Sequence, residues 1–146
     1  MIKIPFITRL PDRIPAGQKS ESLQSVVDLA PTFLSFADID IPRDMTGVDQ
    51  TETWSGGAPA RDHVIVENHH QPTTIHVKTY VNDRYKITAY MDRKYGEIFD
   101  LQEDPDELEN LWDNPFYQEL KMELLQKLIS AEMKKEPMWM PRVSNA

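Results

Sequence analysis

The chain has 146 residues, of which 40% are hydrophobic, so it can bury the core of one domain or of a small domain with an appendage. A net charge of −8 at pH 7 argues against nucleic acid as a partner, because phosphate binding needs clustered Lys and Arg. The absence of cysteine excludes disulfides and thiolate chemistry, and no apolar run reaches the ~20 residues that span a membrane. We therefore expect neither nucleic acid nor membrane as a partner, and the compartment stays open.

The first two predicted elements are a strand and a helix. Ile2 to Leu10 is rich in apolar and β-branched residues, which predicts a short strand. Asp28 is the expected N-cap of a helix over 29–37. Apolar residues recur along this helix at helical spacing and predict one buried face: Leu29, Phe33, Phe36 and Ala37.

A stretch rich in Pro and Gly over 39–60 predicts an irregular connection, and we place a domain boundary near Ala58. The segments beyond it alternate apolar and polar residues and predict about four antiparallel strands, over 62–67, 73–81, 84–90 and 97–101. Asn82 and Asp83 are a hairpin signal between the second and third of these strands. In the third strand we expect the core to take Tyr85, Ile87 and Ala89.

The last predicted element is a helix that begins at Asn114-Pro115, where a capping side chain precedes Pro at the first helical position. It carries a wide apolar stripe: Phe116, Leu120, Leu124, Leu125, Leu128, Ile129 and Met133. We expect this helix to cover one face of the sheet, which makes the fold class α+β. The tail over 136–142 is broken by Pro, and we expect its Trp139 to pack back onto the domain or a neighbour.

The best candidate for a binding site is the pair His69 and His70, which follows the strand predicted over 62–67. Two imidazoles in a loop can donate hydrogen bonds to an anion or coordinate a metal. Adjacent side chains on an extended segment point to opposite sides, however, so a surface or packing role is the competing interpretation. His63 and His76 lie inside predicted strands, and we assign them no role.

The segment from Asp100 to Glu109 holds six acidic residues in ten, which raises the question of calcium. Its spacing does not match a calcium-binding EF-hand loop. Asp104 before Pro105 instead predicts a helix N-cap, with Asp106 and Glu107 stabilised by the helix dipole. We predict no catalytic residue and no metal ligand in this chain.

Two blocks of the sequence resemble the C-terminal region of the sulfatase family. The first holds Ile4 to Pro11, Ile14 to Gly17, Val27 to Thr32, Ile41-Pro42 and Thr46 to Val48, and is similar to the family's "VPxIxRxPG…IPAG…VDLxPT" and "P…GxSL" elements. The second holds Arg84 to Tyr90 and Gly96 to Trp112, and is similar to its "RYK", "FDL" and "DPxExxNL" elements. The blocks stand in family order and cover nearly the whole chain.

The resemblance also implies catalytic motifs that a sulfatase needs and that this chain does not contain. Sulfatases use a formylglycine, made from Cys or Ser within a C/S-x-P-x-R motif, and a divalent metal, calcium, held by Asp-Asp and by Asp-Asn or Asp-His before the first block. None of these motifs is present. We therefore expect a C-terminal fragment of a sulfatase-like hydrolase, inactive alone, with Met1 an added start or the start of a truncated frame.

On this interpretation, residues 1–58 are a remnant strand and helix of the large α/β catalytic domain, and residues 59–146 are the C-terminal subdomain. The expected partner is the remainder of the catalytic domain, and the resemblance implies that His69 or His70 contacts the substrate. Three alternatives remain open. They are a fragment of a related phosphoric or phosphonic ester hydrolase, an interaction module that forms a homo-oligomer through the first strand, and a relative without catalysis.

Overall fold

The computed structural model describes residues 3–70 and 75–135. The N-terminal half holds a 3-10 helix, η1 (Val26–Asp28), and two helices, α1 (Leu29–Phe36) and α2 (Thr51–Trp54). The C-terminal half holds the strands β1 (Val64–His70), β2 (Ile75–Val81), β3 (Tyr85–Tyr90) and β4 (Gly96–Asp100), then a 3-10 helix, η2 (Pro115–Tyr117), and α3 (Gln118–Lys134). Among the described residues, no helix has the length and apolarity needed to cross a membrane.

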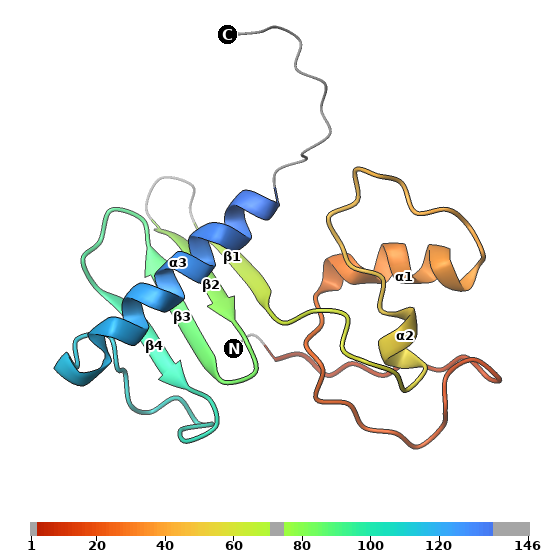
Figure 1. Cartoon of the computed structure of the whole chain (residues 1–146), viewed down its shortest axis with the longest axis horizontal. Coiled ribbons are helices and arrows are strands. Elements are labelled where there is room, and N and C mark those ends of the chain that lie inside the picture. The colour runs from red at the N-terminus through yellow and green to blue at the C-terminus, as the bar shows by residue number, and fades with distance from the viewer. Residues whose placement is uncertain (1–2, 71–74, 136–146) are drawn as a thin grey trace, which may run out of the picture.

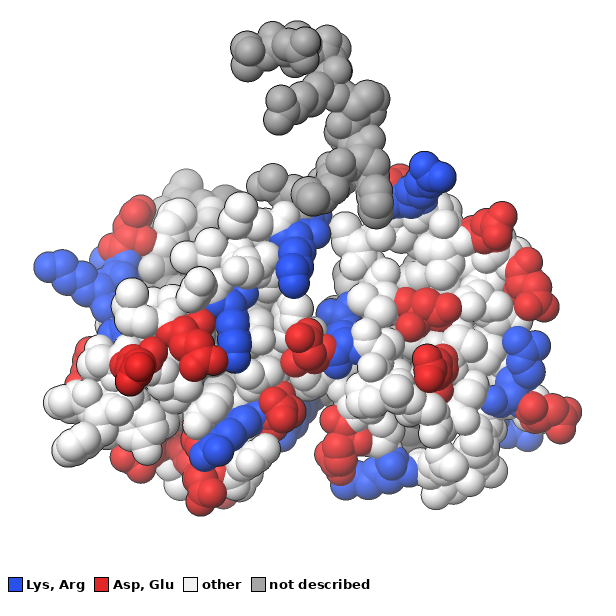
Figure 2. Space-filling model, viewed as in Figure 1, with Lys and Arg blue, Asp and Glu red and all other residues white. Residues whose placement is uncertain are grey.

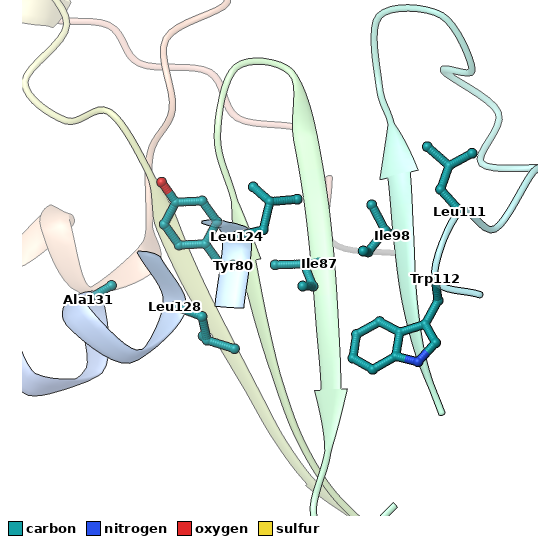
Figure 3. Close-up of a cluster of buried hydrophobic side chains, with 8 residues drawn as sticks. All are labelled: Tyr80, Ile87, Ile98, Leu111, Trp112, Leu124, Leu128 and Ala131. Atoms are coloured by element: carbon teal, nitrogen blue, oxygen red, sulfur yellow. The ribbon is translucent and has the colours of Figure 1, made fainter. Parts of the chain in front are cut away.

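The four strands form one antiparallel sheet in the order β1-β2-β3-β4, and α3 lies across one face of it (Figure 1). The core fills the space between helix and sheet (Figure 3), and its buried members are Tyr80, Ile87, Ile98, Leu111, Trp112, Leu124, Leu128 and Ala131. Tyr85 and Ala89 pack against this cluster, so all three core positions predicted for the third strand are confirmed. The predicted fold class, α+β with a helix on a small antiparallel sheet, is also confirmed.

The hairpin between β2 and β3 lies one residue further along than predicted. The backbone N–H of Asn82 donates to the Tyr85 carbonyl at 3.0 Å, so Asp83 and Arg84 occupy the centre of the turn. The Asn82 Oδ1 also accepts from the backbone N–H groups of Arg84 and Tyr85, at 2.9 and 2.6 Å. This side chain closes the turn from its first position, as Asn commonly does.

The strand predicted over 2–10 was wrong for the residues that the structure describes, since 3–10 contain no strand. A strand needs a neighbour to take its backbone hydrogen bonds, and residues 3–10 pair with neither edge strand of the sheet, β1 or β4. The Phe6 ring instead packs on Trp54, with centroids 5.4 Å apart. Ile4 and Ile7 stay exposed.

The helix predicted over 29–37 is present as α1, but its buried face was predicted wrongly. Phe33 is 58% exposed, whereas Asp28 and Thr32 are 1% and 0% exposed. The segment after α1 folds back onto these polar groups, and Gln50 N–H donates to the Thr32 hydroxyl at 2.9 Å. Asp28 precedes α1 without capping it through its side chain, because its carboxylate accepts from Ser25 N–H instead.

The connection over 39–60 contains a short helix, α2, that the sequence did not predict. Trp54 at its end is 8% exposed and packs against the rings of Phe6, Phe33 and Phe36. Its indole N–H donates to Gln24 Oε1 at 2.8 Å. This aromatic cluster organises a segment whose Pro and Gly content suggested no regular structure.

The helix start predicted at Asp104 was also wrong, because the chain turns there without forming a helix. Glu107 has a positive φ of 57°, which a right-handed helix does not allow. The Asp104 carboxylate accepts from Glu109 N–H at 2.8 Å, and Glu107 pairs with Lys86 on β3. The acidic segment is therefore held by turns and ion pairs.

The helix predicted from Asn114 is confirmed, and Asn114 Oδ1 accepts from Phe116 N–H at 3.0 Å, as an N-cap does. The predicted apolar stripe was too wide, since Phe116, Ile129 and Met133 are 93%, 59% and 65% exposed. A helix lying on a sheet buries only a narrow strip, here Leu124, Leu128 and Ala131. The predicted packing of Trp139 lies outside the described residues.

Candidate functional site

The histidine segment lies inside a strand and not in a loop, which corrects the prediction. β1 continues to His70 because its last residues pair with β2, His69 with His76 and His70 with Ile75. Pairing with β2 therefore extends β1 beyond Glu67, the last residue of the strand predicted from the sequence. The side chain of His70 lies outside what the structure describes.

His69 and His76 face each other on neighbouring strands, and their rings stack with centroids 4.3 Å apart and an interplanar angle of 14°. Side chains alternate between the faces of a strand, so His69 shares its face with Ile65, and His76 shares its face with Tyr80. Ile65 and Tyr80 pack in the core beneath α3. The two imidazoles therefore lie on the face of the sheet that α3 covers.

Four charged residues surround this pair and form one network. Lys78 on β2 pairs with Glu67 on β1 and with Glu132 on α3. Lys135, at the end of α3, donates to Glu67 and Glu132 at 2.6 and 3.3 Å. Each lysine thus bridges the same two carboxylates, and the network joins the end of α3 to the sheet.

The hydrogen bonds from Lys135 and Lys78 lower the pKa of Glu67 from 4.5 to about 2. The same contacts act in reverse on Lys78, where hydrogen bonds from the ammonium to Glu132 and Glu67 raise its pKa. Glu67 is therefore ionised across the range in which a histidine titrates.

A groove of about 760 Å³ opens beside these groups. Its lining includes the charged and imidazole side chains of Glu67, His69, His76, Lys78, Glu132 and Lys135, together with Leu128, Ile129, Met133, Ala89, Tyr90 and Met91. Met91 N–H also donates to the His76 carbonyl at 2.9 Å, which ties the end of β3 to β2. We call this hollow the histidine groove.

His76 and Lys78 belong to the histidine groove, although the sequence assigned them no role in a site. The missing information was the register of β1 on β2. That register is set by the pairing of the two strands and not by the residues within either one. The structure brings His69 and His76 together, while His63 stacks on Tyr80 with centroids 5.1 Å apart.

Replacing Glu67 with Gln should lower the free energy of unfolding at pH 7 by less than about 1 kcal/mol, because the carboxylate is 38% exposed and solvent screens its ion pairs. The pKa of Glu67 is lower in the folded chain, so its contribution is present above pH 4.5 and is lost as the pH falls from 4.5 to about 2. Urea unfolding of both proteins at several pH values measures this difference. Glu119→Gln on α3 is the control, and a difference that grows on acidification would contradict the expectation.

Comparison with known proteins places these observations in context. The family described as "N-sulphoglucosamine sulphohydrolase, C-terminal" matches residues 1–134. An N-acetylglucosamine-6-O-sulfatase of Bacteroides thetaiotaomicron is 31% identical over 134 residues, which are 86% of this chain and 24% of that protein. The chain therefore spans about a quarter of the length of such relatives.

Solved structures show the same fold. A protein in complex with its substrate D-glucosamine-2-N,6-O-disulfate aligns with 93% of this chain and 29% of its own, at a TM-score of 0.79 and 24% identity. A phosphonate monoester hydrolase from Silicibacter pomeroyi aligns with 89% of this chain and 29% of its own, at a TM-score of 0.76 and 18% identity. At these identities the likeness shows the fold alone.

Proposed function

Because the chain belongs to the family of N-sulphoglucosamine sulphohydrolase C-terminal domains, we propose that it acts as the C-terminal part of an enzyme that hydrolyses sulfate esters. About three quarters of the length of such a relative lies outside the part that this chain matches. The chain by itself has no hydrolytic activity on this proposal, and it supplies structure and one wall of the substrate entrance.

The partner that we propose is the remainder of the sulfatase catalytic domain. In support, the N-terminal half exposes many large apolar side chains: Ile4, Ile7, Val26, Val27, Phe33, Ile39 and Ile41. Exposed apolar side chains that gather into one patch mark an interaction site in soluble proteins, and we propose that these residues form such a patch. Residues 1–58 would then be the part that joins the large domain, and residues 59–146 the subdomain attached to it.

The divalent metal and the formylglycine of a sulfatase are proposed to lie in that other part. Among the described residues, no group of three or more His, Cys, Asp or Glu side chains could hold a metal ion. The described residues therefore do not fit the metal site.

Within the complete enzyme, we propose that His69, and with it His70, contacts the substrate. The single observation that supports this is the exposure of His69 at the rim of the histidine groove. An imidazole there can donate to a negatively charged ester.

In an enzyme that includes the preceding catalytic part, His69→Asn should raise KM for a sulfate ester about tenfold with a smaller change in kcat, as loss of one hydrogen bond to a charged group predicts. Initial-rate kinetics measure both constants. His63→Asn is the matched control, because His63 stacks on Tyr80 away from the groove. Equal effects of the two variants would contradict the assignment of His69.

Two other functions are also candidates. The fold shared with a phosphonate monoester hydrolase favours testing phosphonate and phosphate esters beside sulfate esters. The exposure of Ile4 and Ile7 favours testing whether the isolated chain forms a homo-oligomer through residues 2–10. Light scattering of the wild type and of Ile7→Asp distinguishes a dimer that depends on this segment from a monomer.

A further inference from the structure

The stacked imidazoles of the histidine groove have a property that does not depend on sulfatase chemistry. A protonated imidazole is a cation with two N–H donors, whereas a neutral one has a single donor. His69 is exposed and His76 is partly buried, and their ring centroids are 4.3 Å apart. Two protonated rings at this separation repel each other, so a negative group that contacts both would stabilise the doubly protonated pair.

Among the described residues, the charged side chains that line the groove come from both strands and from the helix end. β1 contributes Glu67, β2 contributes Lys78, α3 contributes Glu132, and Lys135 follows α3 directly. The two cations and two anions of this described set cancel, so within it the charge depends on the histidines. It rises from zero when both imidazoles are neutral to +2 when both are protonated.

Glu67 cannot offset this change by taking up a proton itself. Its pKa of about 2 keeps it ionised wherever a histidine titrates. The groove beside the pair, about 760 Å³, has room for a small anion.

We propose that the histidine groove binds an oxyanion at mildly acidic pH, with His69 and His76 as paired donors and proton uptake linked to binding. The ligand class is a sulfate, phosphate or carboxylate group. A free anion and the charged group of a larger ester present the same oxygens to these donors. Binding becomes tighter as the pH falls, by up to about tenfold per pH unit for each proton taken up.

A divalent cation is the competing ligand of an imidazole pair. It fits this groove less well, because Lys78 and Lys135 already pair with Glu67 and Glu132, the carboxylates that would otherwise bind it. A metal ligand must be a neutral imidazole, so a cation and the proposed anion require opposite protonation states of the pair.

The test is a titration of the isolated chain with sodium sulfate, followed through the histidine ring signals in NMR spectra at pH 5.5 and 7.5. Sodium chloride at equal ionic strength is the reference, and sodium acetate separates a general oxyanion site from one selective for tetrahedral anions. We expect sulfate to bind at least tenfold more tightly at pH 5.5 and to shift the signals of His69 and His76 but not those of His63.

Variants sharpen the test. His69→Asn and His76→Asn should each weaken sulfate binding at pH 5.5 by about tenfold, and His63→Asn should leave it unchanged. Glu67→Gln removes a negative charge and should strengthen binding. Equal responses to sulfate and chloride at both pH values would overturn the proposal, and so would sulfate binding that survives in the His69→Asn/His76→Asn double variant.

The wild-type titration needs no variant, so a variant that fails to fold does not decide the outcome. Zinc chloride at pH 7.5 gives a further arm, and zinc binding by a chain that ignores sulfate would identify a metal site instead. Since the isolated chain is titrated without a substrate, failure here leaves the proposed role in a sulfatase standing.

Discussion

Replacing Asp28 with Asn is expected to lower the free energy of unfolding by about 3 kcal/mol or more. The Asp28 carboxylate is 1% exposed and accepts from Ser25 N–H, Val48 N–H and Gln50 Nε2, at 2.9, 2.9 and 3.1 Å. It also pairs with the Arg61 guanidinium, whose side chain is 13% exposed. An amide presents one acceptor oxygen in place of two and leaves the buried guanidinium without a counter-charge, so most of this set of bonds is lost.

Denaturant unfolding measures the effect, with Asp62→Asn as the matched control. Asp62 is adjacent to Arg61 in sequence, but its side chain is 91% exposed. A double-mutant cycle with Arg61→Met separates the ion pair from the other hydrogen bonds, and its coupling energy should exceed 1 kcal/mol. An Asp28→Asn protein that unfolds at the wild-type midpoint would show that the buried carboxylate does not stabilise the fold.

Replacing Leu124 with Ala is expected to cost about 2–5 kcal/mol of unfolding free energy. Leu124 is 0% exposed and lies between α3 and the sheet, where it packs with Ile87 and Ile98 (Figure 3). Truncation leaves a cavity, because α3 is fixed on the sheet by contacts along its length and cannot move inward over one position.

Met122→Ala on the same helix is the control, since Met122 is 69% exposed and should change stability by less than about 0.5 kcal/mol. Thermal unfolding of both variants, each compared with the wild type, checks the difference. Equal losses from the two substitutions would mean that α3 does not cover the sheet through its Leu124 face.

The sheet and its helix could be predicted because local and tertiary preferences agree there. Ile87 alternates with polar neighbours in a half-buried strand, and Asn114 caps the helix that follows. The turn at Asn82 was displaced by one residue because its amide closes the turn from the first position, a detail of hydrogen bonding that composition does not show.

The N-terminal half was predicted less well, because its packing depends on contacts that periodicity does not reveal. Phe33 looks like a core residue of α1, yet it is exposed, and the polar pair Asp28 and Thr32 is buried in its place. The burial of the Asp28 carboxylate is explained by its ion-pair partner, Arg61, which lies 33 residues further along the chain. A strand over 3–10 likewise needs a partner strand, and this segment pairs with neither edge of the sheet.

The candidate site shows the same limit. His69 was identified from the sequence, but its neighbour His76 was not, because the register of two strands is a tertiary property. The charges around the pair could not be anticipated either, since Lys135 and Glu132 reach it from the far end of α3. Figure 2 shows how positive and negative side chains intersperse over this side of the molecule, so charge alone does not single out the groove.

Sulfate-ester hydrolysis should be measured with two proteins, this chain alone and the chain extended by its upstream coding sequence. We predict that the isolated chain releases no sulfate. The extended protein should release it and should carry a C/S-x-P-x-R motif upstream of the Ile4 segment. Sulfate release by the isolated chain, or none by the extended protein, would contradict the assignment of this chain as the C-terminal part of a sulfatase.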